Sequence, residues 1–323
     1  MNAPTSSPAT IALGAALQAA LQSSDVRQDV DIGRLTTYRV GGSASVYVRV
    51  ESSEDLLALV AVSKEFDAEV AVVGRGSNLL VADDGFPGLV VQLGDEFSSI
   101  DTSEAPLVRL GGAASLPAAA RQLSALGLTG FEWAVGVPGS VGGAIRMNAG
   151  GHGSDMSQCV SRARIVNLAT AVSDDRDLSA LAFGYRSSSV LPHELVIEAE
   201  IRLHRGSRED SERQLTEIVA WRRENQPGGH NAGSVFTNPE GDSAGRLIEA
   251  SGLKGVRVGS ASVSTKHANF IQSDDHGRAE DILQLMLLVI ERVEQESGVL
   301  LAPETRFLGF SEADLERLHP WHR

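Results

Sequence analysis

Two glycine-rich loops contain the residues of this sequence best suited to hold an anionic ligand. The first, residues 74–78, reads GRGSN and follows the apolar run AVVG, and the second, residues 135–153, has seven glycines in nineteen positions. Glycine adopts positive φ and lets the backbone approach a ligand closely, and successive N–H groups in such a turn form an anion nest. The pairing of the two loops predicts a pyrophosphate site. A plain hairpin turn and a ligand-free surface loop are the alternatives.

Several familiar site motifs are missing around these loops. Leu79 stands where the third glycine of a dinucleotide fingerprint would be, and no helical pattern begins there. The sequence has no P-loop lysine, no HExxH motif and no Gly-x-Ser-x-Gly elbow. A nucleotide cofactor would therefore be held outside a Rossmann fold, and a hydrolase nucleophile is disfavoured.

Three further stretches carry groups that could do chemistry. Tyr185-Arg186 places a guanidinium beside a phenol, which suits a carboxylate or a phosphate. Ser234 lies between a glycine and an aromatic residue in GSVFTNP, and Glu304 follows the apolar run VLLAP, where desolvation would raise its pKa. Taken singly, each also fits a surface arginine with a packed tyrosine, a simple turn and a solvated glutamate.

The elements that must position these groups follow from periodicity. Helical spacing predicts helices over residues 11–22, 56–66, 116–126 and 279–297, and a long helix that begins at the charged run SREDSER. Ser52 and Asp55 have capping-box spacing before the second of these helices. Strand patterns lie between the helices, which favours an α/β or α+β arrangement, and a change from strand-rich to helix-led sequence near Gly206 predicts a domain boundary.

The composition and net charge of the chain limit the kinds of partner that it can bind. The chain has 323 residues and a net charge of −14, which disfavours nucleic acid and anionic membranes. It has one cysteine, Cys159, which we expect to be a packed hydrophobe in a reducing compartment. No apolar run is long enough to span a membrane, and the first ten residues read as a disordered tail without a signal peptide's basic region, so we expect a cytoplasmic protein.

Together these stretches resemble the UDP-N-acetylenolpyruvoylglucosamine reductase (MurB) family. The matching segments occur in order over most of the chain: LTTYRVGG, VVGRGSNLLVADDGFPGLVV, GFEWAVGVPGSVGGAIRMNAG, FGYRSS, AGSVFTNP, AGRLIEASGLKG, STKHANFI and PETRFLGF. The resemblance implies an α+β protein with a two-subdomain FAD-binding fold of the PCMH/vanillyl-alcohol-oxidase type and a C-terminal α+β substrate-binding domain. The expected divisions are a tail and helix (1–32), FAD subdomains 1 (33–100) and 2 (101–206), and a substrate-binding domain (207–323).

The resemblance also implies a mechanism. In a ping-pong reaction NADPH reduces FAD and leaves, and UDP-N-acetylglucosamine enolpyruvate then accepts a hydride and a proton. Ser234 is the implied proton donor, and Arg186 and Glu304 stabilise the enolic intermediate. Tyr185, Asn238, Lys254 and His267 are expected to contact substrate. No insertion follows Arg186, so the chain is similar to the second type of the family, which lacks a tyrosine-bearing capping loop.

The FAD contacts implied by the resemblance come from both glycine loops. They are Gly74, Arg75, Gly76, Ser77, Asn78, Leu79, Gly136, Pro138, Gly139, Ser140, Gly142, Gly143, Ala144, Asn148, Ala149 and Gly150. The first loop has no histidine, so non-covalent FAD is expected, and no metal is implied. Other readings left open are a different FAD-dependent oxidase or dehydrogenase of the same superfamily and a catalytically silent nucleotide-binding homologue.

Four positions depart from the family pattern. His152 stands where a tyrosine is usual, Asn225 and Thr237 stand where basic residues are common, and His267 stands where an amide or a histidine occurs. The loss of two cations is expected to weaken anion binding, with Arg222 or Arg223 as replacements. A monomer is expected, although the sequence does not determine the oligomeric state.

Overall fold

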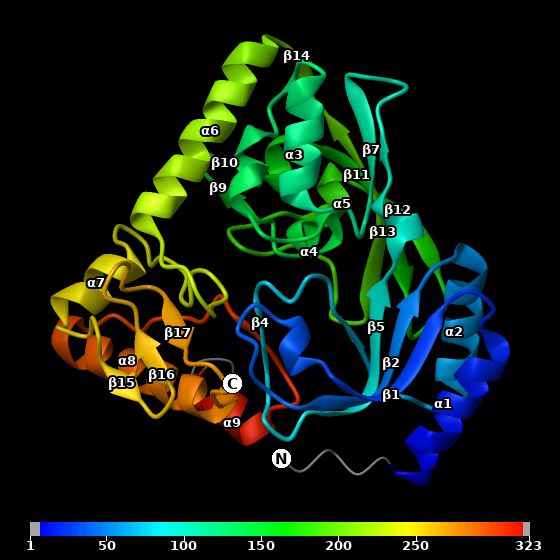
Figure 1. Ribbon diagram of the computed structural model, residues 1–323, viewed down its shortest axis with the longest axis horizontal. Coiled ribbons are helices and arrows are strands. Elements are labelled where there is room, and N and C mark those ends of the chain that lie inside the picture. Colours follow the sequence, from blue (N-terminus) through cyan, green and yellow to red (C-terminus); the bar gives the residue numbers. More distant parts are fainter. Residues whose placement is uncertain (1–6, 319–323) are drawn as a thin grey trace.

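The computed structural model describes residues 7–318 and forms three lobes (Figure 1). The first lobe is built on a mixed four-stranded sheet of order β1-β2-β5-β3. Its members are β1 (Asp25–Asp31), β2 (Ser43–Val50), β5 (Phe86–Leu93), β3 (Val70–Val72), and the helices α1 (Pro8–Ala20) and α2 (Ser53–Glu65).

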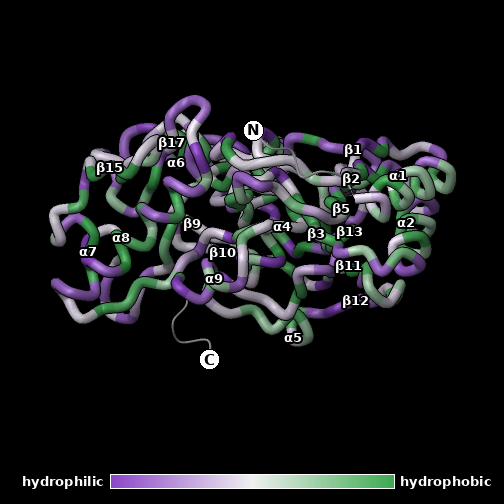
Figure 2. Tube along the Cα trace, turned by 90° about the horizontal axis from the view of Figure 1, so that it is seen from below, coloured by the Kyte–Doolittle hydropathy of each residue, from purple (hydrophilic) through white to green (hydrophobic). Residues whose placement is uncertain are grey.

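Strand β2 is buried on both faces. Its side chains alternate between the two sides of the sheet, and each side is covered. Val46, Val48 and Val50 pack in a core with residues of α1 and α2, while Ala44 and Tyr47 join a second core. The two sets of side chains of this strand thus enter different cores. In Figure 2 the hydrophobic colour gathers near β5 in the interior of the chain, and β12 is hydrophilic.

The second lobe is built on an antiparallel sheet of order β12-β11-β13-β7-β6. Its elements are β6 (Ile100–Asp101), β7 (Leu107–Gly111), α3 (Leu116–Ala125), β8 (Leu128–Thr129), α4 (Val141–Arg146), β9 (Gly150–Gly151), β10 (Ser154–Asp155), β11 (Val160–Asn167), β12 (Ser173–Asp177), α5 (Leu178–Leu181), β13 (Glu194–Arg202) and β14 (His204–Arg205). Cys159 is buried in the core of this lobe, as expected.

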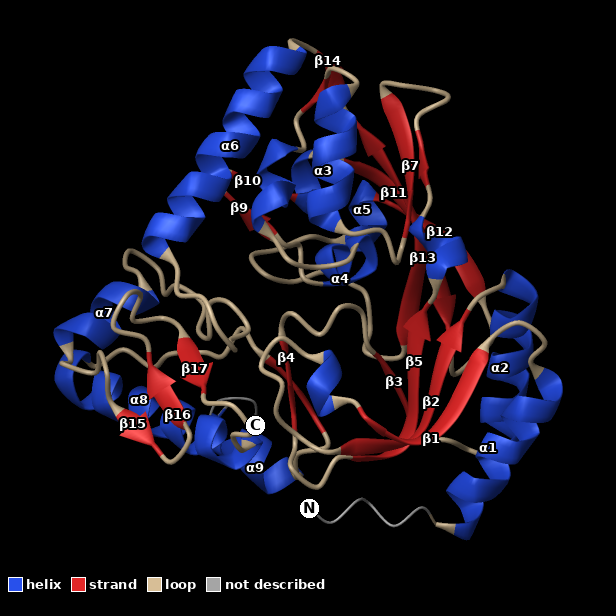
Figure 3. Cartoon of the chain, in the orientation of Figure 1, coloured by secondary structure: helices blue, strands red, loops and turns tan. Residues whose placement is uncertain are grey.

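The third lobe packs helices on a small antiparallel sheet (Figure 3). Its elements are α7 (Ala244–Ala250), β15 (Arg257–Val258), β16 (Ala261–Val263), β17 (Ile271–Ser273), α8 (Ala279–Ser297), β18 (Arg306–Leu308) and α9 (Glu312–Leu318). Strand β18 returns to the first lobe and pairs in parallel with β4 (Leu79–Val81). Asp83 accepts hydrogen bonds from the N–H groups of Ala279 and Glu280, so the first lobe caps α8.

The expected α+β class is confirmed, with differences near the N-terminus and at the boundary of the third lobe. Residues 8–10 are helical and Ser7 caps α1, whereas the first six residues of the expected tail lie outside the described part. Helix α6 (Arg208–Asn225) was expected to open the third lobe, but its Leu215 and Ile218 pack in the core of the second lobe. Packing thus favours a boundary after α6. Among residues 7–318 no helix has the length and apolarity needed to cross a membrane.

Candidate functional site

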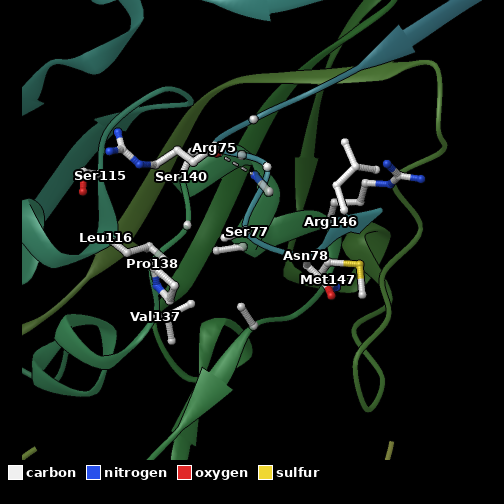
Figure 4. A pocket seen from close by; sticks show the side chains of 18 of the residues that line it. Arg75, Ser77, Asn78, Ser115, Leu116, Val137, Pro138, Ser140, Arg146 and Met147 are labelled. Carbon is white, nitrogen blue, oxygen red and sulfur yellow. Dashed lines mark hydrogen bonds between the residues drawn. The ribbon is translucent and has the colours of Figure 1, made fainter. Parts of the chain in front are cut away.

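The two glycine loops lie against each other at the junction of the first two lobes. A Cβ on Gly74 would come within 2.7 Å of Ser140 Oγ. Gly76 has φ of +63°, and a Cβ there would lie 2.7 Å from the Thr36 Cα, so this position requires glycine. Both loops line a cavity of about 740 Å³. In Figure 4 the labelled side chains extend from Ser115 at one end of the view to Arg146 at the other.

The first loop presents unpaired backbone donors. Within the described residues no acceptor is found for the N–H groups of Arg75, Gly76, Ser77 or Asn78, and all four residues line the cavity. Buried or half-buried N–H groups are nearly always paired in native proteins. A row of free donors beside a cavity is therefore suited to bind the oxygens of a phosphate.

Most of the sixteen residues expected to contact FAD line this cavity. They are Gly74, Arg75, Gly76, Ser77, Asn78, Leu79, Gly136, Pro138, Gly139, Ser140, Gly142, Gly143, Ala144, Ala149 and Gly150. Asn148 is the exception, since it is buried and its amide is used internally. Its Nδ2 donates to the Gly184 carbonyl at 2.9 Å and its Oδ1 accepts from the Ser157 N–H at 3.1 Å. Asn148 therefore connects this loop to the segment that carries Arg186.

Arg186, Ser234 and Glu304 line the same cavity, although they come from three separate segments of the chain. Arg186 Nε lies 2.9 Å from Glu304 Oε1, and its Nη2 donates to the Gly150 carbonyl at 3.2 Å. Its φ is +55°, a strained conformation for a residue with a side chain. The ion pair and the bond to the glycine loop fix the guanidinium in the cavity wall.

Burial raises the pKa of Glu304 above its usual value, although the charges of Arg186 and Arg306 pull it down. The carboxyl side chain is 16% exposed, so loss of hydration outweighs the nearby cations. The Asn78 amide donates to the Glu304 carbonyl at 3.0 Å, which connects Glu304 to the first glycine loop. The carboxyl of Glu304 therefore binds a proton more readily than that of a solvated glutamate.

The Ser234 hydroxyl has no hydrogen-bond partner among the described residues. The residues on either side of it are held. The Gly233 N–H donates to Asn231 Oδ1 at 3.1 Å, and the Val235 carbonyl accepts the Glu304 N–H at 2.7 Å. The hydroxyl is therefore free to donate to a ligand from a fixed backbone.

Three arginines that sequence reasoning missed also line the cavity, Arg49, Arg146 and Arg306, and the first of these is ion-paired with Glu51 and Asp95. Arg146 forms no ion pair within residues 7–318, and burial, with the charge of Arg306, lowers its pKa. Burial also lowers the pKa of Arg306, whose Nε lies 3.2 Å from the Met147 sulfur. Arg146 could have been noticed from the sequence, because it is the one Arg, Lys, Asp or Glu in the glycine-rich stretch 135–153.

The four residues expected to contact substrate lie outside the described lining of this cavity. Tyr185 is 59% exposed beside the Arg186 guanidinium. Asn238 Oδ1 accepts the Ala244 N–H at the start of α7, and Lys254 Nζ lies 2.7 Å from Glu249 Oε1. Burial and then the charge of Lys254 lower the pKa of His267. Their contact with substrate therefore stays a prediction.

The departures from the family pattern have clear local partners. His152 packs edge-to-face on Trp221 of α6 with ring centroids 5.1 Å apart, and burial and the charge of Arg222 lower its pKa. Asn225 Nδ2 donates to the Trp221 carbonyl and Thr237 Oγ1 to the Ala302 carbonyl, at 2.8 and 3.2 Å.

The two arginines expected as replacement cations are placed differently. Arg222 lines the cavity, and its Nε donates to Gln226 Oε1 at 2.7 Å. Arg223 is not part of the described lining, and its carbonyl accepts from Lys266 Nζ at 2.6 Å. Arg222 is thus the one of the two that can supply charge to a ligand in this cavity.

Comparisons with known proteins agree with this geometry. Residues 44–171 match the FAD binding domain, and residues 225–308 match the UDP-N-acetylenolpyruvoylglucosamine reductase C-terminal domain. UDP-N-acetylenolpyruvoylglucosamine reductase of Synechococcus sp. (strain CC9311) is 39% identical over 92% of this chain and 98% of its own length. The second such reductase of Symbiobacterium thermophilum is 41% identical over 88% and 92%.

A solved structure is similar over most of the fold. The crystal structure of UDP-N-acetylenolpyruvylglucosamine reductase (MurB) from Thermus caldophilus has a TM-score of 0.77 and 34% identity to this chain. The alignment covers 88% of this chain and 99% of that one, so all three lobes have counterparts there.

Proposed function

The chain belongs to the UDP-N-acetylenolpyruvoylglucosamine reductase family, and we propose that it reduces UDP-N-acetylglucosamine enolpyruvate to UDP-N-acetylmuramate with NADPH as hydride donor. It is an FAD-dependent oxidoreductase of peptidoglycan synthesis. The observation that carries the proposed reaction is one cavity lined by both glycine loops and by Arg186, Ser234 and Glu304.

The residues present fit FAD. The free N–H groups of residues 75–78 suit the oxygens of its diphosphate, and Gly74 and Gly76 let this loop pack directly against Ser140 and Thr36. Bound FAD would carry a hydride from NADPH to the terminal carbon of the enolpyruvyl group. Neither histidine nor cysteine is among the described residues that line the cavity, and non-covalent binding stays our prediction.

We assign the remaining steps to three side chains of the protein. As hydride reaches the terminal carbon, negative charge develops on the adjacent carbon and its carboxylate. The fixed cation of Arg186 stabilises that charge, and protonated Glu304 donates a hydrogen bond to the developing oxyanion. Ser234 then gives its proton to the adjacent carbon and regains one from water. A serine hydroxyl is a weak acid, so the transfer depends on alignment within the cavity.

The cations of the cavity support two anionic ligands that bind in turn. Arg146, Arg222 and Arg306 provide positive charge in the cavity that also contains Arg186 and Glu304, although the whole chain has a net charge of −14. We propose that NADPH and the sugar nucleotide use this charge successively, as a ping-pong reaction requires. We further propose a monomer in a reducing cytoplasm, with no nucleic acid or membrane partner.

Anaerobic stopped-flow spectroscopy tests the proposal. NADPH should bleach the flavin absorbance near its visible maximum, and UDP-N-acetylglucosamine enolpyruvate should restore it. A flavin that stays reduced with this substrate would reject the assigned substrate. Reoxidation that is equally fast with oxidants of other chemical classes, in the absence of this substrate, would reject it as well. A purified protein that binds no flavin would instead indicate a silent nucleotide-binding homologue.

A further inference from the structure

Asn269 is a buried amide, 4% exposed, that holds the backbone just after Ser234. Its Oδ1 accepts the Phe236 N–H at 3.0 Å, and its Nδ2 donates to the Phe236 carbonyl at 2.8 Å. Its own carbonyl accepts the Val235 N–H at 2.9 Å. The three hydrogen bonds of this one residue thus fix three consecutive peptide units, from Ser234–Val235 to Phe236–Thr237, next to the cavity.

The orientation of this amide is determined by its partners. An N–H requires an acceptor and a carbonyl requires a donor, so only one of the two flipped forms satisfies Phe236. The site is buried, and an unsatisfied amide there would cost stability. Asparagine supplies this donor and this acceptor at every pH, whereas an aspartate of the same shape supplies the donor only when its carboxyl is protonated.

The same backbone segment also fixes Glu304. The Val235 carbonyl accepts the Glu304 N–H at 2.7 Å, and Phe236 forms an antiparallel bridge with Pro303. Ser234 and Glu304 are therefore connected through one peptide unit whose other side is held by Asn269. Ser234 itself forms no hydrogen bond with the described residues, so its position depends on these neighbours.

We propose that Asn269 is a positioning residue that aligns the Ser234 hydroxyl with the reacting carbon and with Glu304. The proposal rests on the role of Ser234 in the proposed function. A displacement of about 1 Å at a reacting centre lowers a rate by about 10²-fold. Asn269 acts only in the protonation half-reaction, because the reduction of FAD by NADPH does not use Ser234.

Asn269→Asp tests this with little change of shape. Ionised aspartate keeps the acceptor for the Phe236 N–H but turns the other oxygen, without a proton, towards the Phe236 carbonyl. A protonated carboxyl restores the donor, and burial favours that form. Flavin reoxidation by the enolpyruvyl substrate should fall about 100-fold at alkaline pH and recover as pH is lowered. Reduction by NADPH and the dissociation constant of the substrate should change by less than about threefold.

The charged and titratable groups around position 269 must be separated from this effect. They are His267, whose Nδ1 accepts the Asn269 N–H, Lys254 beside that ring, and Glu304 across Val235. All three are present in the wild type, so its pH profile is subtracted. Only the additional acidic recovery in the variant reports the new carboxyl.

Ser211→Ala is the matched control for lost stability. Ser211 is 2% exposed, and its hydroxyl donates to Glu132 Oε1 at 2.6 Å at a site outside the cavity lining. This variant should lower Tm as Asn269→Asp does, with both half-reactions unchanged. Equal slowing of both half-reactions in Asn269→Asp, or slow reoxidation at every pH, would overturn the positioning role. A wild type that is not reoxidised by the substrate would instead reject the proposed function.

Discussion

Polar groups are paired around the buried carboxylate of Asp55 but are left unpaired in the wall of the cavity. Asp55, 3% exposed, accepts hydrogen bonds from the N–H groups of Gln22 and Ser23 and from the hydroxyls of Ser23 and Ser24, at 2.7–2.9 Å. In the cavity wall, the side chains of Arg146 and Ser234 have no hydrogen-bond partner among the described residues.

The difference separates groups that stabilise the fold from groups that await a ligand. Burial of a polar group costs free energy unless a partner replaces water. Around Asp55 the chain supplies that partner itself, which joins the turn after α1 to helix α2. In the cavity the protein leaves polar groups unpaired, so bound FAD, NADPH or substrate must complete them. Substitutions in the two regions should therefore have opposite effects on stability and on catalysis.

The largest effect is expected for Ser234→Ala. Loss of the proposed proton donor should slow flavin reoxidation by the enolpyruvyl substrate about 10³-fold, within the usual range for a general acid. Reduction by NADPH should stay nearly unchanged, because that step does not need this proton. Stopped-flow measurement of both half-reactions checks the result. Equal loss in the two would reject the assigned role.

The next largest effect is expected for Asp55→Ala, and it concerns stability. Four hydrogen bonds from residues 22–24 lose their acceptor, which should lower the free energy of unfolding by about 3 kcal/mol. Both half-reactions at 20 °C should be unchanged. Urea unfolding monitored by circular dichroism measures the loss, with Glu65→Ala, an exposed carboxylate at the end of α2, as the control. A catalytic defect at a temperature where the variant is folded would contradict the distinction between the two regions.

Asp55 also predicts an acid dependence. Burial raises the pKa of Asp55, but the hydrogen bonds from residues 22–24 outweigh burial and hold it below the usual value. Its stabilising contribution is therefore complete above the unfolded pKa of about 4 and is lost as pH falls through the lower folded pKa. The difference in unfolding free energy between wild type and Asp55→Ala should shrink only below about pH 4.

A smaller effect is expected for Glu304→Gln. Because the pKa of Glu304 is raised, wild-type reoxidation should decline as pH rises through that value and the hydrogen-bond donor is lost. Glutamine keeps a hydrogen-bond donor at every pH, so the reoxidation rate of the variant should be nearly independent of pH. An amide is a weaker donor than a carboxylic acid, so that rate should be about tenfold below the wild-type rate at acidic pH. A variant profile that still declines like the wild type would assign the titration to another group.

The smallest effect is expected for Arg146→Met. Removal of an unpaired, partly buried charge should raise the unfolding free energy of the flavin-free protein by about 1 kcal/mol. It should also weaken binding of the anionic ligands five- to tenfold, which corresponds to about 1 kcal/mol. Thermal unfolding and titration of both ligands measure the two effects, with exposed Arg121→Met as the control. Lower stability of the flavin-free variant would show that Arg146 is structural.

Local elements could be predicted because their signals are local. Helix α8 spans Ala279–Ser297, as the spacing of its apolar residues indicates, and α7 is followed by Gly252 at a φ of +71°. The glycine loops could also be predicted, because a close backbone approach such as that at Gly76 requires glycine. Which residues share the cavity wall depends on packing between distant segments, and Arg306, unlike Arg146, has no comparable signal in the sequence.

The sequence by itself determined where the long helices lie to within a few residues, which loops expose backbone and, through ordered motifs, which family the chain belongs to. Tertiary structure decided where their side chains point. Ser52 caps α2 as its spacing predicts, but Asp55 turns from the expected capping box towards residues 22–24. Likewise, the hydrogen bonds between Asn269 and Phe236 form only when these two segments meet in the folded chain. A side chain with several possible partners chooses by proximity, and proximity between distant segments exists only in the folded chain.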